Sequence, residues 1–280
     1  MRRMIIEFTL LVALAAAVFL VTQPDSRLGM RFYPLVREAA AAKMDYQTRN
    51  LAVTETPHFT IKYAEQDADT VAIVAQAAEA AYQPVTQGLG YTPEGKTIII
   101  INRSRSELNR NFGWSGDQSA MGVYWGGVIQ VLSPHVWLKD TTADSFIRSG
   151  PMVHEFTHLV LDHLTRGNYP RWFTEGLAQY EEYQINGYEW QTANNSLQGQ
   201  LYPMSELDKS FDSLPNQALA YRESLAAVRY IAEVHGEDRL RQVISLLAAG
   251  RSMADAIATS LGMDYDSFNV AWPRWARANM

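Results

Sequence analysis

One stretch of the chain carries residue types that can bind a metal and move a proton: His154-Glu-Phe-Thr-His158. On a helix, residues four apart lie one turn above each other, so the His154 and His158 imidazoles can reach one cation from a rigid backbone. Neutral imidazole suits zinc, and a catalytic zinc takes three protein ligands and a water. Glu155 points to a neighbouring sector, where it can take the proton from that water as the water attacks a carbonyl. The alternative is a helix whose histidines only cap or pack.

A third ligand is needed. Glu175 follows His158 by seventeen residues, in the segment Pro170–Glu182. The segment between them is a turn, because Gly167 can end the first helix and Pro170 can start the next. Two helices joined by so short a loop pack antiparallel, which lets Glu175 face back onto the histidine pair.

The segment Trp172-Phe-Thr-Glu-Gly-Leu-Ala178 carries a resemblance to a known family. With it, the sequence resembles the gluzincin zinc metallopeptidases, and most closely the peptidase-MA-like family, in which H-E-x-x-H is followed by W-x-x-E-G-x-A. A metzincin would instead carry a glycine and a histidine where this chain has Leu161 and Leu164, which excludes that class. The resemblance implies the ligands of one zinc ion, His154, His158 and Glu175, and the general base, Glu155.

Two further positions bear on this resemblance. The family has an A-Y-x-x-S block whose tyrosine lies near the metal, which implies Tyr221 as the hydrogen-bond donor to the oxyanion of the tetrahedral intermediate. Otherwise Tyr221 packs between lobes. Thermolysin-like relatives carry an aspartate where this chain has Gln179, so another group must orient His154. Glu181 and Glu182 are expected on a solvated helix face, although either could be that group.

Before the zinc motif, the pattern predicts a mixed sheet. The expected elements are strands at His58–Tyr63, Lys96–Asn102, Met121–Trp125 and Val128–Leu132, with a helix at Asp67–Gly88 and another from Ser104 to Arg110. Gly126-Gly127 predicts a hairpin between the last two strands. In gluzincins the strand immediately before the zinc helix is the edge on which an extended peptide pairs, so the resemblance implies substrate pairing at this hairpin. A hairpin that only completes the sheet is the alternative.

The second half of the chain reads as helical. The expected helices are a zinc helix at Phe146–Thr165, one from near Pro215 to Gly236, and three closing helices at Asp238–Leu247, Ser252–Thr259 and Asp264–Ala278. A polar stretch, Gln191–Gln200, is expected as a loop over the cleft. Trp272 and Trp275 are expected as core anchors. The remaining histidines are expected to be structural: His58, His135, His163 and His235.

Composition limits the function classes. The 280 residues are 47% hydrophobic, enough for a full core, and the formal charge of −6 with no basic run argues against a nucleic-acid partner. The chain has no cysteine, so neither a disulfide framework nor a thiolate metal site is possible. Imidazole and carboxylate are the metal ligands that remain.

The N-terminus predicts export. Arg2 and Arg3 precede an apolar run over residues 4–21, long enough to span a bilayer, so residues 1–22 are expected as a signal anchor or signal peptide. An uncleaved transmembrane anchor is favoured because a small-x-small cleavage site is poorly placed; a cleaved signal is the rival. Either way the catalytic domain is expected outside the cytoplasm, periplasmic or extracellular, membrane-anchored or secreted. Residues 23–54 are expected as a juxtamembrane spacer with a short helix at Pro34–Arg49.

The sequence therefore predicts an α+β, thermolysin-like (gluzincin) domain over residues 55–280, with a mixed N-terminal sheet and a helical C-terminal lobe. Its expected parts are a sheet lobe at 55–145, zinc helices at 146–185 and a helical lobe at 200–280. The expected function is zinc-dependent hydrolysis of peptide bonds in a peptide or protein substrate. A non-catalytic, zinc-stabilised envelope scaffold and a hydrolase of a non-peptide amide, such as a cell-wall component, stay open.

Overall fold

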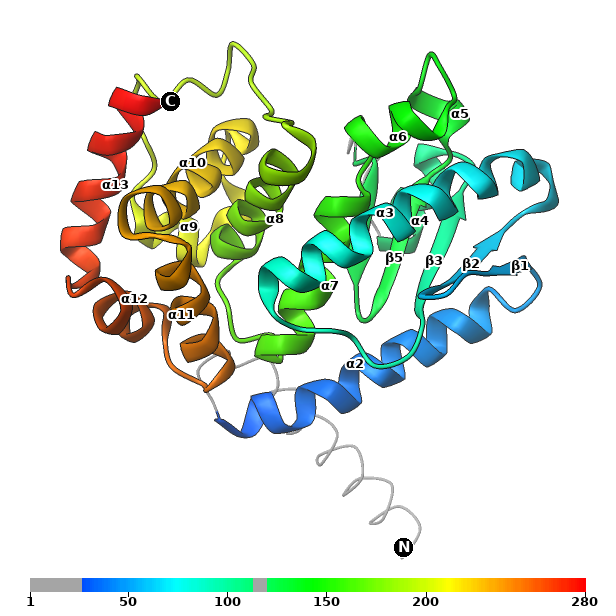
Figure 1. The fold of residues 1–280 in the computed structure, drawn as a ribbon, viewed down its shortest axis with the longest axis horizontal. Helices are drawn as coiled ribbons and strands as arrows, with labels where there is room; N and C mark the ends of the chain where they lie inside the picture. Colours follow the sequence, from blue (N-terminus) through cyan, green and yellow to red (C-terminus); the bar gives the residue numbers. More distant parts are fainter. Residues whose placement is uncertain (1–26, 113–119) are drawn as a thin grey trace, which may run out of the picture.

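The computed structural model describes residues 27–112 and 120–280 as a mixed α+β fold, mostly helical, with one small sheet (Figure 1). The expected signal segment at 1–22 lies outside these residues, as do residues 113–119. Within the described ranges, each helix is too short or too polar to cross a bilayer.

The sheet has five strands in the order β1-β2-β3-β5-β4. The central strands β2, β3 and β5 run parallel, and each edge strand is antiparallel to its neighbour. The run of isoleucines in β3 fits a strand that is covered on both faces. The strands are β1 (Ala52–Glu55), β2 (Phe59–Tyr63), β3 (Thr97–Asn102), β4 (Gly122–Trp125) and β5 (Val128–Leu132).

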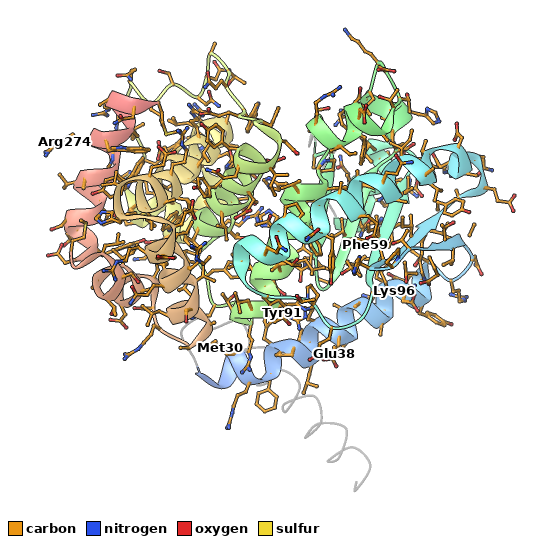
Figure 2. The ribbon with its side chains drawn as sticks, viewed as in Figure 1. Met30, Glu38, Phe59, Tyr91, Lys96 and Arg274 are labelled. Atoms are coloured by element: carbon orange, nitrogen blue, oxygen red, sulfur yellow. The ribbon has the colours of Figure 1, made fainter. Side chains whose placement is uncertain are left out.

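Helices cover both faces of this sheet. The crossover from β2 to β3 contains a short 3₁₀ turn (Glu65–Thr70) and α3 (Val71–Leu89), which ends at the left-handed Gly90. Phe59, fully buried, belongs to the core shared by α3 and the sheet (Figure 2). On the other face, Met44 of α2 packs in a separate small core with strands β3 and β5.

Residues expected to form a spacer are part of this fold. Helix α2 (Arg27–Gln47) begins earlier than the expected short helix, and β1 is an edge strand paired to β2. The start of α2 also reaches the helical lobe, because Met30 Sδ would lie 3.1 Å from a Cβ added at Gly250 (Figure 2). The boundary at residue 55 therefore lies inside the sheet lobe.

The predicted hairpin is present. Gly126 and Gly127 have φ values of +57° and +86°, which suit the two-residue turn between β4 and β5. The edge strand, however, is β4: β5, the strand immediately before the zinc helices, lies between β3 and β4. The expected edge for substrate pairing is therefore corrected to the first strand of the hairpin.

The single expected zinc helix is two helices, α6 (Ala143–Ser149) and α7 (Met152–Thr165). Gly150 and Pro151 separate them, because proline cannot donate the helical hydrogen bond and restricts the residue before it. A side chain at Gly150 would also meet the Phe146 carbonyl oxygen, 2.3 Å from the added Cβ. The histidine pair therefore lies near the start of its helix.

The C-terminal lobe is all helical (Figure 1). Helices α8 and α10 pack closely, since a Cβ on Gly176 would lie 2.2 Å from the Ser224 carbonyl oxygen. Trp272 is buried and Trp275 partly buried, in line with their expected anchoring roles. The helix expected to reach Gly236 ends with a π-helical turn (Ile231–His235). The lobe comprises α8 (Arg171–Asn186), α9 (Met204–Lys209), α10 (Gln217–Tyr230), α11 (Glu237–Ala248), α12 (Met253–Leu261) and α13 (Tyr265–Asn279). Two short helices, α4 (Arg105–Phe112) and α5 (Pro134–Trp137), lie in the sheet lobe.

Candidate metal centre

The two motif histidines lie one turn apart on α7 and face each other. Their ring centroids are 4.7 Å apart, with an angle of 82° between the planes. His154 is the third residue of the helix and keeps partial exposure, whereas His158 is buried. The start of α7 after Pro151 thus presents one open and one enclosed imidazole on the same helix face.

Glu175 of α8 completes the group, as the sequence predicts. Its Oε2 lies 3.1 Å from His154 Nε2, and its Oε1 lies 3.6 Å from His158 Nε2. The three side chains each offer a ligand atom within 4.8 Å of the others. Bonds of about 2.0–2.1 Å to a tetrahedral zinc would put neighbouring ligand atoms roughly 3.3 Å apart, so the arrangement fits one ion.

The other ring nitrogen of each histidine is held from α8. His154 Nδ1 lies 2.9 Å from Glu182 Oε2, and His158 Nδ1 lies 2.6 Å from Thr174 Oγ1. These contacts fix the ring orientations and leave both Nε2 atoms for the metal. Glu182, two turns after the ligand glutamate, thereby supplies the orienting carboxylate that the sequence lacks at Gln179.

Gln179 has another role. Its side-chain amide donates to the backbone carbonyl oxygens of Glu175 (3.1 Å) and Tyr221 (2.8 Å), which ties α8 to α10 beside the site. Glu181 is buried rather than solvated, and burial together with Glu237 raises its pKa to about 7. The expected solvated helix face is therefore wrong for Glu181. A partly buried Glu182 that bonds His154 does not lie on such a face either.

Charges around the ligand group are strongly coupled. Burial acts to lower the pKa of His154, but the carboxylates of Glu182 and Glu175 outweigh it and raise that pKa well above its usual value. Burial acts to raise the pKa of Glu175, but Arg171 and His158 hold it well below its usual value. The donor set is thus anionic and rich in imidazole, which suits a divalent cation such as zinc.

Glu155 lies beside the ligand group without belonging to it. Its side chain is buried, and burial raises its pKa, which His154 and His158 act to lower. Its Oε2 accepts a 2.6 Å hydrogen bond from the backbone N–H of Tyr124 in β4. A carboxylate with a raised pKa next to a metal position is suited to accept and return a proton.

Tyr221, the candidate oxyanion donor, lies at the edge of the site. Burial, followed by the charge of Glu175, raises its pKa, so the phenol stays protonated and can donate. Its ring packs edge-on against Trp190, at a centroid distance of 6.0 Å, and against Phe211, at 5.4 Å. Trp190 directly precedes the polar segment Gln191–Gln200, which was expected as a loop and is irregular in the structure.

Arg171 is a site residue that the motif analysis missed. Its Nη1 lies 2.5 Å from Glu175 Oε1, one helical turn away, and its Nε lies 3.2 Å from Asp212 Oδ1. The i, i+4 spacing of an arginine before the ligand glutamate was the available signal. This guanidinium balances part of the negative charge and remains exposed.

The other histidines lie apart from the group, as expected. His58 pairs with Glu79 and His135 with Asp69, at 2.6 Å and 2.9 Å. Burial lowers the pKa of His163 to about 4, and its ring packs against Tyr91. His235 packs against Tyr230.

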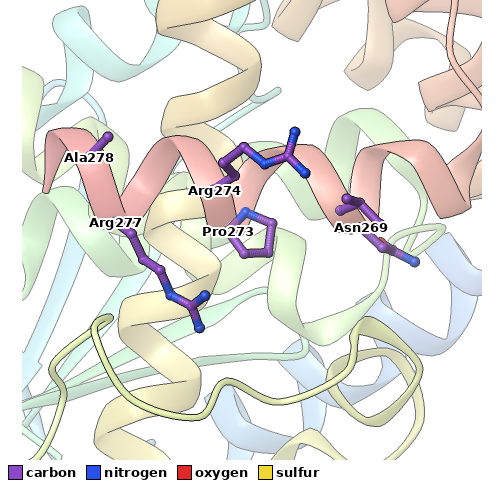
Figure 3. A pocket seen from close by; sticks show the side chains of 6 residues that line it. Asn269, Pro273, Arg274, Arg277 and Ala278 are labelled. Carbon is purple, nitrogen blue, oxygen red and sulfur yellow. The ribbon is translucent and has the colours of Figure 1, made fainter.

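A shallow groove on α13 is a separate feature of the surface (Figure 3). It contains none of the ligand or base residues. Its lining residues are Asn269, Val270, Pro273, Arg274, Arg277 and Ala278.

The comparison with protein-family models agrees with the predicted family. The sequence model of the peptidase MA superfamily matches residues 138–278, about half of the chain, including both zinc-motif segments. A similar solved structure is described as a crystal structure of a two-domain M1 zinc metallopeptidase E323A mutant bound to L-arginine. The identity is 14% and the TM-score 0.42, and the match covers 81% of this chain and 50% of that one. This chain thus spans about half the length of that relative. No curated protein sequence matches.

Proposed function

Because the chain belongs to the peptidase MA superfamily, we propose that it is a zinc-dependent metallopeptidase of the thermolysin-like, gluzincin type. The observation that carries this proposal is the position of Glu155. Its buried carboxylate lies beside the group formed by His154, His158 and Glu175 but is not one of the three ligands. A site that held zinc only for stability would have no use for such a base.

The roles of the side chains follow from their chemistry. His154, His158 and Glu175 would hold the zinc, which when bound acts as a Lewis acid and lowers the pKa of water. Glu155 accepts the proton of the attacking water and delivers it to the leaving amine. The Tyr221 hydroxyl donates a hydrogen bond to the oxyanion of the tetrahedral intermediate.

The substrate is a peptide or protein segment in extended conformation. Strand β4 is an edge of the sheet and lies against α7 at Glu155. Apart from the Tyr124 N–H, which donates to Glu155, the outer edge of such a strand offers unpaired backbone groups to which an extended peptide can add as a further strand. We place the scissile region of the substrate along this edge, beside Glu155.

We place the enzyme outside the cytoplasm, tethered by its N-terminal segment. The basic start and the apolar run at 4–21 support a signal anchor. Helix α2, which follows, carries an exposed apolar patch of Phe32, Leu35 and Val36, with exposures of 45%, 59% and 48%. Such a patch suits a bilayer interface close to the anchor. Secretion after cleavage of the segment is the rival.

The test compares the purified full chain with Glu155→Gln, a variant of nearly equal size. Both proteins are loaded with zinc and incubated with a mixture of random-sequence peptides, and the products are identified by mass spectrometry. We expect cleavage by the wild type and a drop of roughly 10²–10⁴-fold in kcat for the variant, with equal zinc content.

Two results would contradict the proposal. Equal activity of both proteins, or none in either, favours a zinc-stabilised scaffold. Turnover of cell-wall fragments without any peptide cleavage indicates a hydrolase of a non-peptide amide.

A further inference from the structure

A second polar cluster surrounds Asp162, eight residues after His154 on the same helix. The Asp162 side chain is fully buried. Its Oδ1 accepts from the hydroxyls of Tyr33 (2.6 Å) and Tyr169 (3.1 Å). Its Oδ2 accepts from the Tyr124 hydroxyl (2.7 Å) and from Arg37 Nη1 (3.3 Å). Four donors from three other parts of the chain therefore meet on one carboxylate.

Tyr124 belongs to this cluster and to the candidate active site at once. Its hydroxyl donates to Asp162, and its backbone N–H donates to Glu155 Oε2. The two acceptors are seven residues apart on α7, which is about 10 Å along a helix axis. One residue of β4 thus bridges two turns of α7, with the carboxylate of the proposed base at one end.

Strand β4 runs very close to Glu155. A Cβ added at Gly122 would lie 2.8 Å from Glu155 Cγ and 2.9 Å from its Oε1. The Tyr124 N–H points out of the sheet edge towards α7 rather than to β5, so the sheet does not fix its position. The position of this N–H depends on what holds β4 against the helix.

We propose that Asp162 is a positioning residue for the reaction: through the Tyr124 hydroxyl it holds β4 against α7 and so fixes the carboxylate of Glu155. The catalytic half of this inference rests on the proposed peptidase function. The positional half does not, because it concerns contacts within the chain. Glu155 reaches a defined orientation only when its Oε2 is held, and the holder is the Tyr124 N–H.

The cluster contains its own matched control. Tyr124 and Tyr169 each donate one hydroxyl to Asp162, so Tyr124→Phe and Tyr169→Phe each delete one hydrogen bond to the same carboxylate. Only Tyr124 belongs to β4. A role that was merely structural would make the two variants alike.

The experiment measures two properties of wild type, Tyr124→Phe, Tyr169→Phe and Asp162→Asn, all as zinc-loaded full chains. One is the hydrogen-exchange rate of the Tyr124 backbone amide by NMR. The other is the kcat and KM for cleavage of fluorescein-labelled casein. Folded fraction and zinc content are determined for each variant, and Tyr124→Phe carries the test if Asp162→Asn does not fold.

We expect exchange of the position-124 amide to accelerate at least about tenfold in Tyr124→Phe and Asp162→Asn. Their kcat should fall about tenfold with KM within about twofold, since the interaction acts on the base and not on substrate binding. Tyr169→Phe should leave both properties near the wild-type values.

Equal effects of the two phenylalanine variants would overturn the proposal, as would an unchanged exchange rate in Tyr124→Phe. If exchange responds as expected but the wild type cleaves no casein and no peptide, the positional inference stands and the proposed peptidase function fails.

Discussion

The two ends of α7 carry two polar clusters of opposite design. At the first end, the carboxylates of Glu155, Glu175 and Glu182 gather around two histidines, and one ring remains partly exposed. At the other end, a single carboxylate, Asp162, is fully buried and matched by a guanidinium and three hydroxyls. The first cluster has negative charge in excess and suits a cation, whereas the second is balanced by the chain itself. One helix thus carries a candidate cation-binding site near its start and a buried, charge-balanced cluster near its end.

Alanine substitutions in the two clusters should change different properties: zinc content in one case and stability in the other. These are the largest expected effects. Glu175→Ala, purified under metal-limited conditions, should hold much less than one zinc per chain because it loses one of three ligands. Asp162→Ala should keep the three ligands but lose about 3–5 kcal/mol in the free energy of unfolding, because Arg37 and three hydroxyls lose a buried partner. Metal analysis and urea unfolding measure the two effects.

Two results would contradict this contrast between a metal-binding cluster and a stabilising cluster. Full zinc occupancy in Glu175→Ala would show that the third ligand is wrong. A free energy of unfolding unchanged in Asp162→Ala would show that the second cluster adds no stability.

In the cluster around His154 and His158, Glu182→Gln should lower zinc affinity less than the loss of a ligand does. The amide keeps the size of the side chain but removes the charge that orients and polarises His154 through its Nδ1. Zinc affinity should fall about 10–100-fold, which competition with a chelator measures. Gln179→Ala is the control, since Gln179 bonds backbone carbonyls and contacts neither imidazole by hydrogen bond. An equal loss of affinity in both variants would remove the orienting role of Glu182.

The smallest effect concerns His163, which lies beside the balanced cluster. Burial, followed by the charge of Arg37, lowers its pKa from 6.5 to about 4, while Asp162 acts in the opposite direction. Between these pH values the unfolded chain binds a proton that the folded chain excludes, so stability falls as the pH drops from 6.5 towards 4. Between pH 7 and pH 4.5 the free energy of unfolding should therefore fall less in His163→Gln than in the wild type. The two decreases should differ by at most about 2 kcal/mol, since the ring is partly exposed.

Urea unfolding of both proteins at the two pH values measures this difference. The same pH dependence in wild type and variant would show that His163 is not held neutral by its surroundings.

The sequence predicted the cluster around His154 and His158 far better than the cluster around Asp162. His154, Glu155 and His158 are defined by spacing within one helix, and Glu175 follows from a short turn that brings the next helix back. The Asp162 cluster depends on Tyr33 and Arg37, which are 129 and 125 residues away along the chain. Local periodicity carries no information on such pairs.

The fold shows the same division. Strands with β-branched runs and helices with clear caps were found close to their predicted bounds, and the Gly126-Gly127 hairpin is confirmed. The break at Gly150-Pro151 was missed, although a glycine followed by a proline is itself a signal for a helix boundary. Which hairpin strand forms the edge was also missed, since strand order depends on tertiary pairing.

The place of α2 has a consequence for the proposed membrane anchor. Tyr33 and Arg37 attach this helix to the Asp162 end of α7, about 12 Å along the axis from His154. If the N-terminal segment is the membrane anchor proposed above, the anchor is joined to α2 and, through it, to the end of α7 that lies away from Glu155.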